Sequence, residues 1–162
     1  MIEQIVTIGA YGYNADRFIR ALRDAGVDLF IDVRARRGVR GSEYAFANAK
    51  RLQAALAEAG IGYVHVVELA PPKEIRQAQY RVDEAQGVAK RTRAALSDQF
   101  VHSYEKACLA GFDPAHFVAS VCGPARRPAL FCVEREADAC HRSLVAKRLR
   151  DQLSVPVLNL SP

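Results

Sequence analysis

The sequence predicts an α/β protein in which a mainly parallel, five-stranded sheet lies between two layers of helices, as in Rossmann and flavodoxin-like folds. Runs of branched aliphatic residues alternate with segments of helical periodicity, and most connections between them are short. The chain of 162 residues has the length of one domain, and half of its residues are hydrophobic. We therefore expect a single α/β domain over residues 1–162, with a helical insertion at about 70–128 between the third and fourth strands.

The amino-terminal part of the chain repeats a strand–helix pattern. A β-branched run at 5–8 ends at Gly9, Asn14 has the residue type of a helix N-cap, and Gly26 has that of a helix stop. The remaining elements expected here are strands at 27–33 and 61–67 and a helix at about 46–59. Strands separated by helices favour parallel pairing, because a parallel connection must cross the sheet.

The middle of the chain departs from this pattern. After a Pro-Pro pair, the polar residues 74–87 predict either a partly ordered excursion, such as a lid or an oligomer contact, or an ordinary solvated helix. Helical periodicity is expected again at about 89–109. Asp113 followed by Pro114 has the pattern of a helix cap with proline in the first turn, and Gly123 would end that helix.

The carboxy-terminal part returns to the alternating pattern. We expect a buried strand at 129–133, a helix at about 137–153 and a short last strand at 155–158. Within this helix, Val145, Leu149 and Leu153 recur every four residues and mark the face toward the sheet. Four residues earlier the same stripe reaches His141. We therefore expect His141 to point inward near the helix amino terminus, where free backbone amides and partial positive charge lie.

Composition excludes several classes of protein. No apolar run approaches the roughly 20 residues that a membrane-spanning helix needs, and the amino terminus has no basic region or cleavage site. We expect a cytoplasmic protein without a membrane partner; the sequence leaves its oligomeric state open. The four cysteines are expected to be free thiols, because a cytosolic protein of this size needs no disulfide framework.

The net charge is +5, and the basic residues gather in two places. Arginine suits anionic ligands because its planar fork grips phosphate or carboxylate with two hydrogen bonds. The two groups predict contact with an anionic small molecule or a nucleic acid, although a solvated basic surface would give the same pattern. The first group comprises Arg34, Arg36, Arg37 and Arg40, and the second comprises Lys90, Arg91 and Arg93.

Polar residues also follow the ends of three predicted strands. Asp32 and Arg34 end the second strand, Glu68 lies just past the third, and Cys132 and Glu134 end the fourth. In open parallel sheets, ligands bind in the crevice beyond the carboxyl ends of the strands. The sequence therefore predicts the working site at this edge of the sheet.

Cys132 is the predicted nucleophile of this site. It would face a helix amino terminus together with His141 and Arg142, and each of these stabilises a thiolate. Cys140 is the second candidate for a reactive thiol, and simple packing is the alternative for both cysteines. A metal site is disfavoured: neighbours on a helix diverge by about 100 degrees, which would keep Cys140 and His141 from one ion, and the chain has no Cys-x-x-Cys pair. We expect neither a metal nor a cofactor.

Four stretches carry a family resemblance: Thr7-Ile8-Gly9 with Tyr11-Gly12, Asp32-Val33-Arg34, residues 59–69, and Cys132-Val133-Glu134 followed by Cys140-His141-Arg142-Ser143-Leu144. In these stretches the chain resembles the bacterial and archaeal family called domain of unknown function 488. The resemblance implies no settled activity. The recurring polar residues of the family correspond to Asp32, Arg34, Arg40, Glu68, Cys132, Glu134, Cys140, His141 and Arg142. The chain differs from the family at Arg37 and Val39, where proline and serine are usual, and at Glu136-Ala137, which replaces an Asp-Pro helix opening.

Two functional hypotheses from different classes follow. The first is an enzyme acting on an anionic substrate that contains phosphate or derives from nucleic acid. Its residues would be Cys132 as nucleophile, His141 as base or charge partner, Glu134 or Asp32 as acid/base or orienting carboxylate, and Arg34, Arg40 and Arg142 as the anion grip, with Glu68 and Cys140 as further ligand-binding residues. The second is a non-enzymatic nucleotide or nucleic-acid binding module with structural cysteines.

The enzyme hypothesis has a loose parallel in known layouts. The Asp-Val-Arg after the second strand and the cysteine after the fourth resemble sulfurtransferase (rhodanese-like) and phosphatase-like arrangements. A thiol phosphatase, however, needs arginine six places after its cysteine, and here that place holds Asp138.

Overall fold

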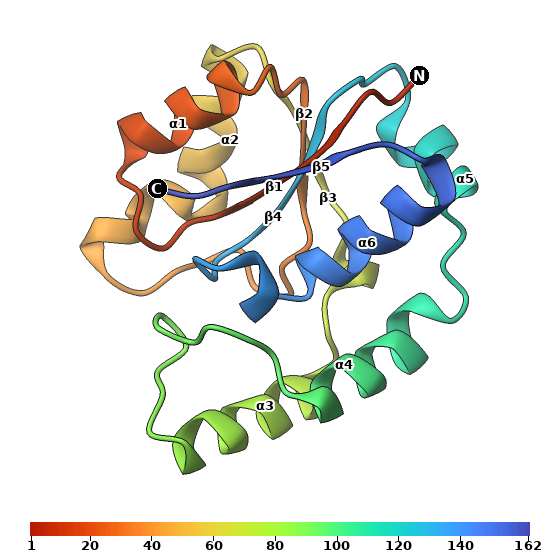
Figure 1. The fold of residues 1–162 in the computed structure, drawn as a ribbon. Helices are drawn as coiled ribbons and strands as arrows, with labels where there is room; N and C mark the ends of the chain where they lie inside the picture. Colours follow the sequence, from red (N-terminus) through yellow and green to blue (C-terminus); the bar gives the residue numbers. More distant parts are fainter.

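The structure, a computed structural model that describes residues 1–162, is built on a five-stranded, all-parallel sheet (Figure 1). The strand order is β3-β2-β4-β1-β5. The strands are β1 (Ile5–Gly9), β2 (Leu29–Asp32), β3 (Gly62–His65), β4 (Pro128–Cys132) and β5 (Val157–Leu160). The predicted fold class is therefore confirmed. Because β4 lies between β2 and β1, the strand that ends in Cys132 occupies the centre of the sheet.

Six α-helices connect the strands. They are α1 (Ala15–Asp24), α2 (Ala49–Glu58), α3 (Lys73–Ala85), α4 (Asp98–Tyr104), α5 (Pro114–Phe117) and α6 (Arg142–Leu153). Figure 1 shows α1 and α2 on one side of the sheet and α5 and α6 on the other. The chain thus crosses to one face of the sheet after β4, whereas after the neighbouring strands β1 and β2 it crosses to the opposite face. Such a change of direction opens a crevice at the carboxyl edge between the strands concerned.

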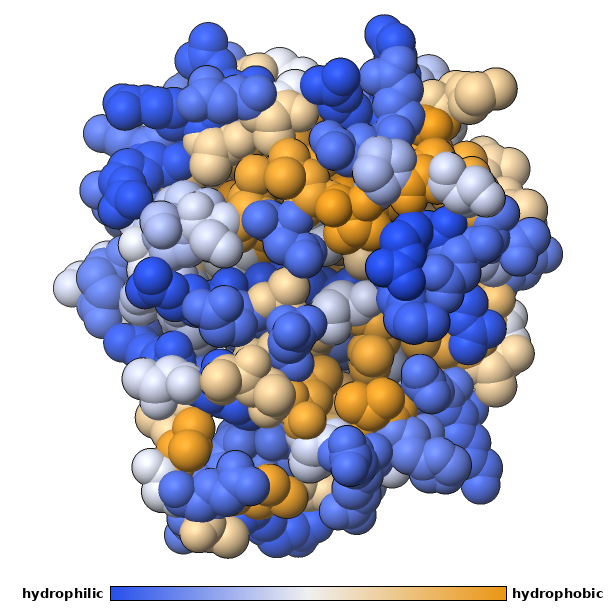
Figure 2. Space-filling model, in the orientation of Figure 1, coloured by the Kyte–Doolittle hydropathy of each residue, from blue (hydrophilic) through white to orange (hydrophobic).

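The core forms between these layers. Strands β1 and β4 are buried along their whole length. On the α1 side, Phe18 packs its ring against Phe30 and Phe131 at centroid separations of 6.1 and 5.6 Å. Edge-to-face packing of this kind adds to the burial of the rings themselves. Hydrophilic side chains dominate the face seen in Figure 2, with apolar ones gathered mainly in its upper middle. No helix of the structure is long and apolar enough to cross a membrane.

Local capping signals were reliable guides. The Asn14 side chain accepts a hydrogen bond from the backbone N–H of Arg17 and begins α1. The Asp113 carboxylate accepts from the backbone N–H groups of Ala115 and His116 and begins α5. The helix that starts at α5 continues as a π-turn and ends at Gly123, whose φ of 53° is in the left-handed region.

Most of the segment 74–87 belongs to α3, so the ordinary helix was the right alternative there. Two other predicted elements have different bounds in the structure. The expected helix at 89–109 begins only at Asp98, because the preceding loop carries Arg93 into the interior, where it bonds to Asp83 and Ala139. The last strand is displaced to 157–160, because Pro156 has no N–H for a sheet hydrogen bond.

The insertion between β3 and β4 determines where the site lies. Figure 1 shows α3 and α4 across the lower end of the molecule, beneath the carboxyl ends of the strands. The two helices contact each other, and Tyr104 of α4 donates a hydrogen bond to the Leu69 carbonyl at 2.6 Å. The insertion therefore covers the carboxyl edge of the sheet and leaves a cleft beneath it.

Candidate functional site

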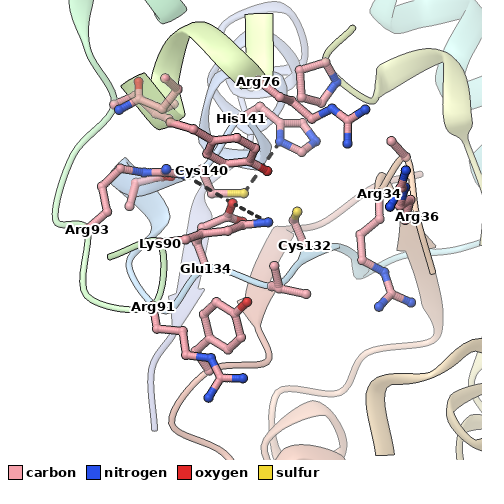
Figure 3. Close-up of a pocket in the computed structure, with 18 of the residues that line it drawn as sticks. Arg34, Arg36, Arg76, Lys90, Arg91, Arg93, Cys132, Glu134, Cys140 and His141 are labelled. Atoms are coloured by element: carbon pink, nitrogen blue, oxygen red, sulfur yellow. Dashed lines mark hydrogen bonds and ion pairs between the residues drawn. The ribbon is translucent and has the colours of Figure 1, made fainter. Parts of the chain in front are cut away.

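A cleft of about 720 Å³ lies between the carboxyl ends of the strands and the insertion. Its walls come from the ends of β1, β2 and β4, from α3, and from the loop between α3 and α4 (Figure 3). Among the charged residues that line the cleft, only Glu134 is acidic and the others are basic. The basic lining residues are Arg34, Arg36, Arg40, Lys73, Arg76, Lys90, Arg91 and Arg93. The cleft thus has the size and charge for a small anionic ligand.

Asp32 and Arg34 form a buried ion pair with each other. Arg34 donates from Nε to Asp32 Oδ1 at 2.9 Å and from Nη2 to Oδ2 at 2.8 Å. Its Nη1 donates to the Ala47 carbonyl at 2.9 Å, and Tyr63 donates its hydroxyl to Asp32 Oδ2 at 2.8 Å. Each guanidinium nitrogen of Arg34 thus makes a hydrogen bond inside the protein, and these bonds hold the loop after β2 in place.

His141 points inward from the amino terminus of α6, as the helix stripe predicts. The ring is 4% exposed, and its Nε2 lies 2.9 Å from the Val33 carbonyl oxygen. A carbonyl can only accept, so Nε2 carries a proton and Nδ1 is the nitrogen that exchanges one. The Tyr104 ring packs against the imidazole with centroids 5.4 Å apart. These contacts set both the orientation and the tautomer of His141.

Cys140 is the sulfur that faces this nitrogen. Its Sγ lies 3.8 Å from His141 Nδ1 (Figure 3). Burial raises the pKa of the Cys140 thiol, but the neighbouring Cys132 thiol, Arg142 and His141 outweigh it and hold this pKa well below its ordinary value. Burial likewise lowers the pKa of His141, and the charge of Cys140 reverses that effect, so that the pKa is raised. The arrangement favours a thiolate–imidazolium pair.

Cys132 shares one negative charge with Cys140. The pKa of Cys132 is raised well above the ordinary thiol value, first by its contact with Cys140 and then by burial. Two thiolates side by side in the interior would repel each other, so the pair releases one proton easily and holds the second. The lowered pKa thus belongs to Cys140, whereas the sequence pattern pointed to Cys132 as the reactive thiol.

The spacing argument against a metal site assumed a helix at Cys140, and the structure has none there. Cys140 is not on a helix: it has extended dihedral angles (φ −139°, ψ 142°) between a 3₁₀ turn at Ala137–Ala139 and the start of α6. The predicted helix at 137–153 is thus broken at this residue, and the 100-degree divergence of helical neighbours does not apply. Ligand atoms of Cys132, Cys140 and His141 lie within 4.8 Å of one another, near enough for one soft metal ion to touch all three.

These residues fall in a region that also carries the family signature. The sequence profile of the family described as "Domain of unknown function DUF488" matches residues 14–149. The chain belongs to the DUF488 family. Comparisons of the chain with curated proteins and with solved structures found no match. In this DUF488 protein, the matched range includes β2, β4, the whole insertion and the thiol–imidazole cluster.

Glu134 is the buried carboxylate that lines the cleft of this protein. Its Oε1 accepts from Arg93 Nη2 at 3.2 Å and lies 3.7 Å from Lys90 Nζ, while its Oε2 is shielded from water and has no partner. Burial raises the pKa of Glu134, and the negative charge of Cys140 raises it further. The side chain can therefore hold a proton at higher pH than an exposed glutamate and present it inside the cleft.

Arg142 stabilises the backbone of the loop that follows β4. It donates from Nη1 to the Glu134 carbonyl at 2.7 Å and from Nη2 to the Arg135 carbonyl at 3.2 Å, and it is 1% exposed. Gly9 allows this close approach, because a Cβ there would lie 1.8 Å from the Glu134 carbonyl oxygen. Arg142 contributes positive charge near Cys140 without lining the cleft.

The remaining predicted ligand residues separate into two groups. Arg40 is exposed and lines the cleft, and its carbonyl accepts a hydrogen bond from Arg91 Nη2. Glu68 is exposed and is not among the residues that line the cleft, because the chain turns into a 3₁₀ segment at Val67–Leu69 after β3. The rule that ligands bind beyond the carboxyl ends of parallel strands (the strand-end rule) places residues at an edge of the sheet. It does not predict whether their side chains point into the cleft or away from it.

Sequence reasoning missed Arg76 of the insertion, which lines the cleft. Lys90 and Arg93 belong to the second of the two basic groups predicted for an anionic ligand, but nothing in the sequence indicated that both contact Glu134. Arg93 is buried and also pairs with Asp83 at 2.6 Å. Arg76 belongs to the polar helix α3, whose sequence gave no signal for a site. Only the folding of α3 over the sheet brings these residues to the cleft.

Proposed function

We propose that this protein is an enzyme that uses the Cys140 thiolate, paired with His141, as a nucleophile toward an anionic substrate bound in the cleft. The observation that carries the proposal is the Cys140–His141 contact of 3.8 Å at the wall of a cleft with a basic lining. A thiolate is a far better nucleophile than a thiol, and an adjacent imidazolium stabilises it near neutral pH.

The proton of Cys140 has a defined acceptor. Because Nε2 of His141 is committed to the Val33 carbonyl, the free lone pair of the neutral ring is on Nδ1, which faces the sulfur. Transfer of the thiol proton to Nδ1 leaves the thiolate at the amino terminus of α6, where the helix dipole also favours negative charge. Val33 thus has the orienting role that a carboxylate has in a Ser-His-Asp triad.

Four cations of the cleft are available to a substrate. Arg36, Arg40, Lys73 and Arg76 line it and have no carboxylate partner, whereas Lys90, Arg91 and Arg93 are paired with protein carboxylates. The Nε of Arg76 is also shielded from water without a hydrogen-bond partner. A phosphate or carboxylate group of a ligand would satisfy these donors. The charge pattern supports an anionic substrate over a neutral one.

Glu134 would supply the proton that the leaving group needs. Its free oxygen is buried next to the cysteine pair, and its raised pKa keeps a proton available. The resulting assignment has Cys140 as nucleophile, His141 as proton acceptor, Glu134 as proton donor, and the unpaired arginines as the anion grip. Asp32, Arg34 and Arg142 position these groups through the loops they hold.

The test is the pH dependence of thiol alkylation in the folded protein. Iodoacetamide is added to the wild type and to Cys140→Ser, Cys132→Ser and Cys122→Ser at a series of pH values from about 5 to 9, and the labelled cysteine is identified by peptide mass spectrometry. Cys140 should react at pH 6 to 7, where an ordinary thiol is almost fully protonated. Cys122, whose pKa burial raises to about 11, is the matched buried control and should stay unlabelled.

Protection by an anion completes the test. Inorganic phosphate should slow the labelling of Cys140, and this protection should weaken as the salt concentration rises. If Cys140 reacts no faster than a model thiol at pH 6 to 7, the nucleophile assignment fails. Phosphate binding with an unreactive Cys140 would instead support the binding module. Preferential labelling of Cys132 would return the nucleophilic role to that residue.

A further inference from the structure

We propose that Cys132 is the resolving thiol of Cys140: the two cysteines form a disulfide as they reduce a disulfide substrate, and an external dithiol reductant then restores both thiols. The inference rests on the proposed function, because it needs Cys140 as the attacking sulfur. It deepens that function by naming the substrate class: a disulfide that carries negatively charged groups. A single nucleophilic cysteine would need no second thiol beside it.

The geometry of the two cysteines carries the inference. Their sulfurs lie within 4.8 Å of each other, both residues line the cleft, and both are almost fully buried. A disulfide requires the sulfurs to approach to about 2.05 Å, which rotation about the Cα–Cβ bonds can achieve when the side chains already point toward each other. Cys140 has extended backbone outside α6, so such a rotation does not meet the preceding turn of a helix.

The loop that joins the two cysteines is held at both ends. Arg142 binds the carbonyls of Glu134 and Arg135, and Arg93 binds the carbonyl of Ala139 from Nε at 3.3 Å and from Nη2 at 3.0 Å. These contacts fix the positions at which the chain leaves β4 and returns to α6. The sulfurs are therefore kept close without a bond between them, which is what a reversible pair requires.

The other two cysteines show what a packed thiol looks like in this protein. Cys108 and Cys122 do not line the cleft, and burial raises the pKa of each. Neither has histidine or a second cysteine among the groups that shift its pKa. Proximity of two thiols is thus specific to the cleft, and Cys108 and Cys122 serve as internal controls for any redox measurement.

The reaction balances in two exchange steps. The Cys140 thiolate attacks one sulfur of a substrate R–S–S–R′, the S–S bond breaks, and R′–S⁻ leaves with the proton of Glu134. Cys132 gives its proton to the Glu134 carboxylate and attacks the Cys140 sulfur of the mixed disulfide. The Cys132–Cys140 disulfide forms, and R–S⁻ leaves with the proton of the His141 imidazolium. Two electrons pass from the cysteine pair to the substrate, which is reduced to two thiols.

The experiment uses oxidised glutathione, a disulfide with several carboxylates, as the probe. The protein is reduced, freed of metal with a chelator and incubated with the probe; remaining thiols are blocked with N-ethylmaleimide after an acid quench. Intact mass and peptide mapping then identify each product. Wild type, Cys108→Ser and Cys122→Ser should all contain a Cys132–Cys140 disulfide. Cys132→Ser should instead accumulate glutathione on Cys140, and Cys140→Ser should react at least tenfold more slowly.

The outcomes separate this inference from the proposed function. If Cys140 is alkylated at pH 6 to 7 but wild type accumulates only the mixed disulfide, the resolving role of Cys132 is overturned and the nucleophile remains. If Cys140 is not alkylated there, the proposed function itself fails. Retention of one metal ion per chain by Cys132, Cys140 and His141 would also overturn the dithiol cycle, because both thiolates would then be ligands. Thermal melting of each variant verifies that it is folded.

Discussion

Replacing Asp32 by asparagine tests whether the residues after β2 stabilise the fold, as the structure indicates, or bind substrate. The two Asp32 oxygens accept from the backbone N–H of Arg34 at 3.2 Å, from its Nε and Nη2 at 2.9 and 2.8 Å, and from the Tyr63 hydroxyl at 2.8 Å. Asp32 is fully buried and Arg34 is 3% exposed. Asp32→Asn removes the negative charge and leaves the guanidinium in the interior without a counter-ion.

The expected loss follows from this burial. Removing one partner of a buried ion pair typically costs about 3–5 kcal/mol, and the lower end applies here because asparagine keeps one acceptor oxygen. A loss of about 3 kcal/mol corresponds to a fall in Tm of about 6–12 °C for a chain of this length. The measurement is urea unfolding followed by circular dichroism, with a thermal melt of the same samples.

A matched control and a double variant make the test specific. Asp151 also accepts from two cations, Lys147 and Arg150, but it lies on the surface of α6. Asp151→Asn should therefore cost less than about 1 kcal/mol. Adding Arg34→Met to Asp32→Asn should recover part of the loss, because the unpaired charge is then gone. A cost below about 1 kcal/mol for Asp32→Asn would refute the structural role.

Three further predictions concern the cleft. Gly9→Ala should destabilise the protein by at least about 1–3 kcal/mol in thermal melts, because its Cβ would lie 1.8 Å from the Glu134 carbonyl oxygen; an unchanged Tm would contradict this. The raised pKa of Glu134 stabilises the folded protein fully below about pH 4.5, and this stabilisation is lost as the pH rises through the folded-state pKa. Between about pH 5 and 7, the free energy of unfolding should therefore fall less with rising pH in Glu134→Gln than in the wild type. An equal fall in the two proteins would count against a raised pKa. Arg76→Gln should weaken phosphate binding in calorimetry about tenfold, whereas Arg20→Gln on the exposed side of α1 should leave it unchanged; equal effects would argue against a cleft site.

Much of the architecture could be predicted because its signals are local. A β-branched run marked β1 and an apolar run marked β4. Asn14 and Asp113 marked helix starts, and the stripe of apolar residues on α6 predicted that His141 points inward. Each of these signals depends on the preferences of a few consecutive residues. The boundaries were less accurate where a distant contact overrode them, as when burial of Arg93 replaced the expected helix at 89–97 by a loop.

The candidate site was predicted in place but not in detail. The strand-end rule brought Cys132, Glu134 and Asp32 to one edge, since parallel strands all end there. It did not reveal that Arg34 turns back onto Asp32, or that Glu68 stays outside the cleft. Nor did it indicate Arg76, which reaches the cleft only because α3 crosses the edge of the sheet.

By itself, the sequence predicted an alternating α/β fold and a candidate site at one edge of the sheet that contains cysteine and histidine. Only the tertiary structure showed which sulfur faces the imidazole. Cys140 leaves the helix for an extended conformation, so its sulfur meets Nδ1 of His141 and lies beside Cys132. The physical reason is that the periodicity of apolar residues in the sequence depends on the conformation of residues that are neighbours along the chain. The pKa of a buried thiol depends instead on charges and dipoles from distant segments that folding brings within a few ångströms.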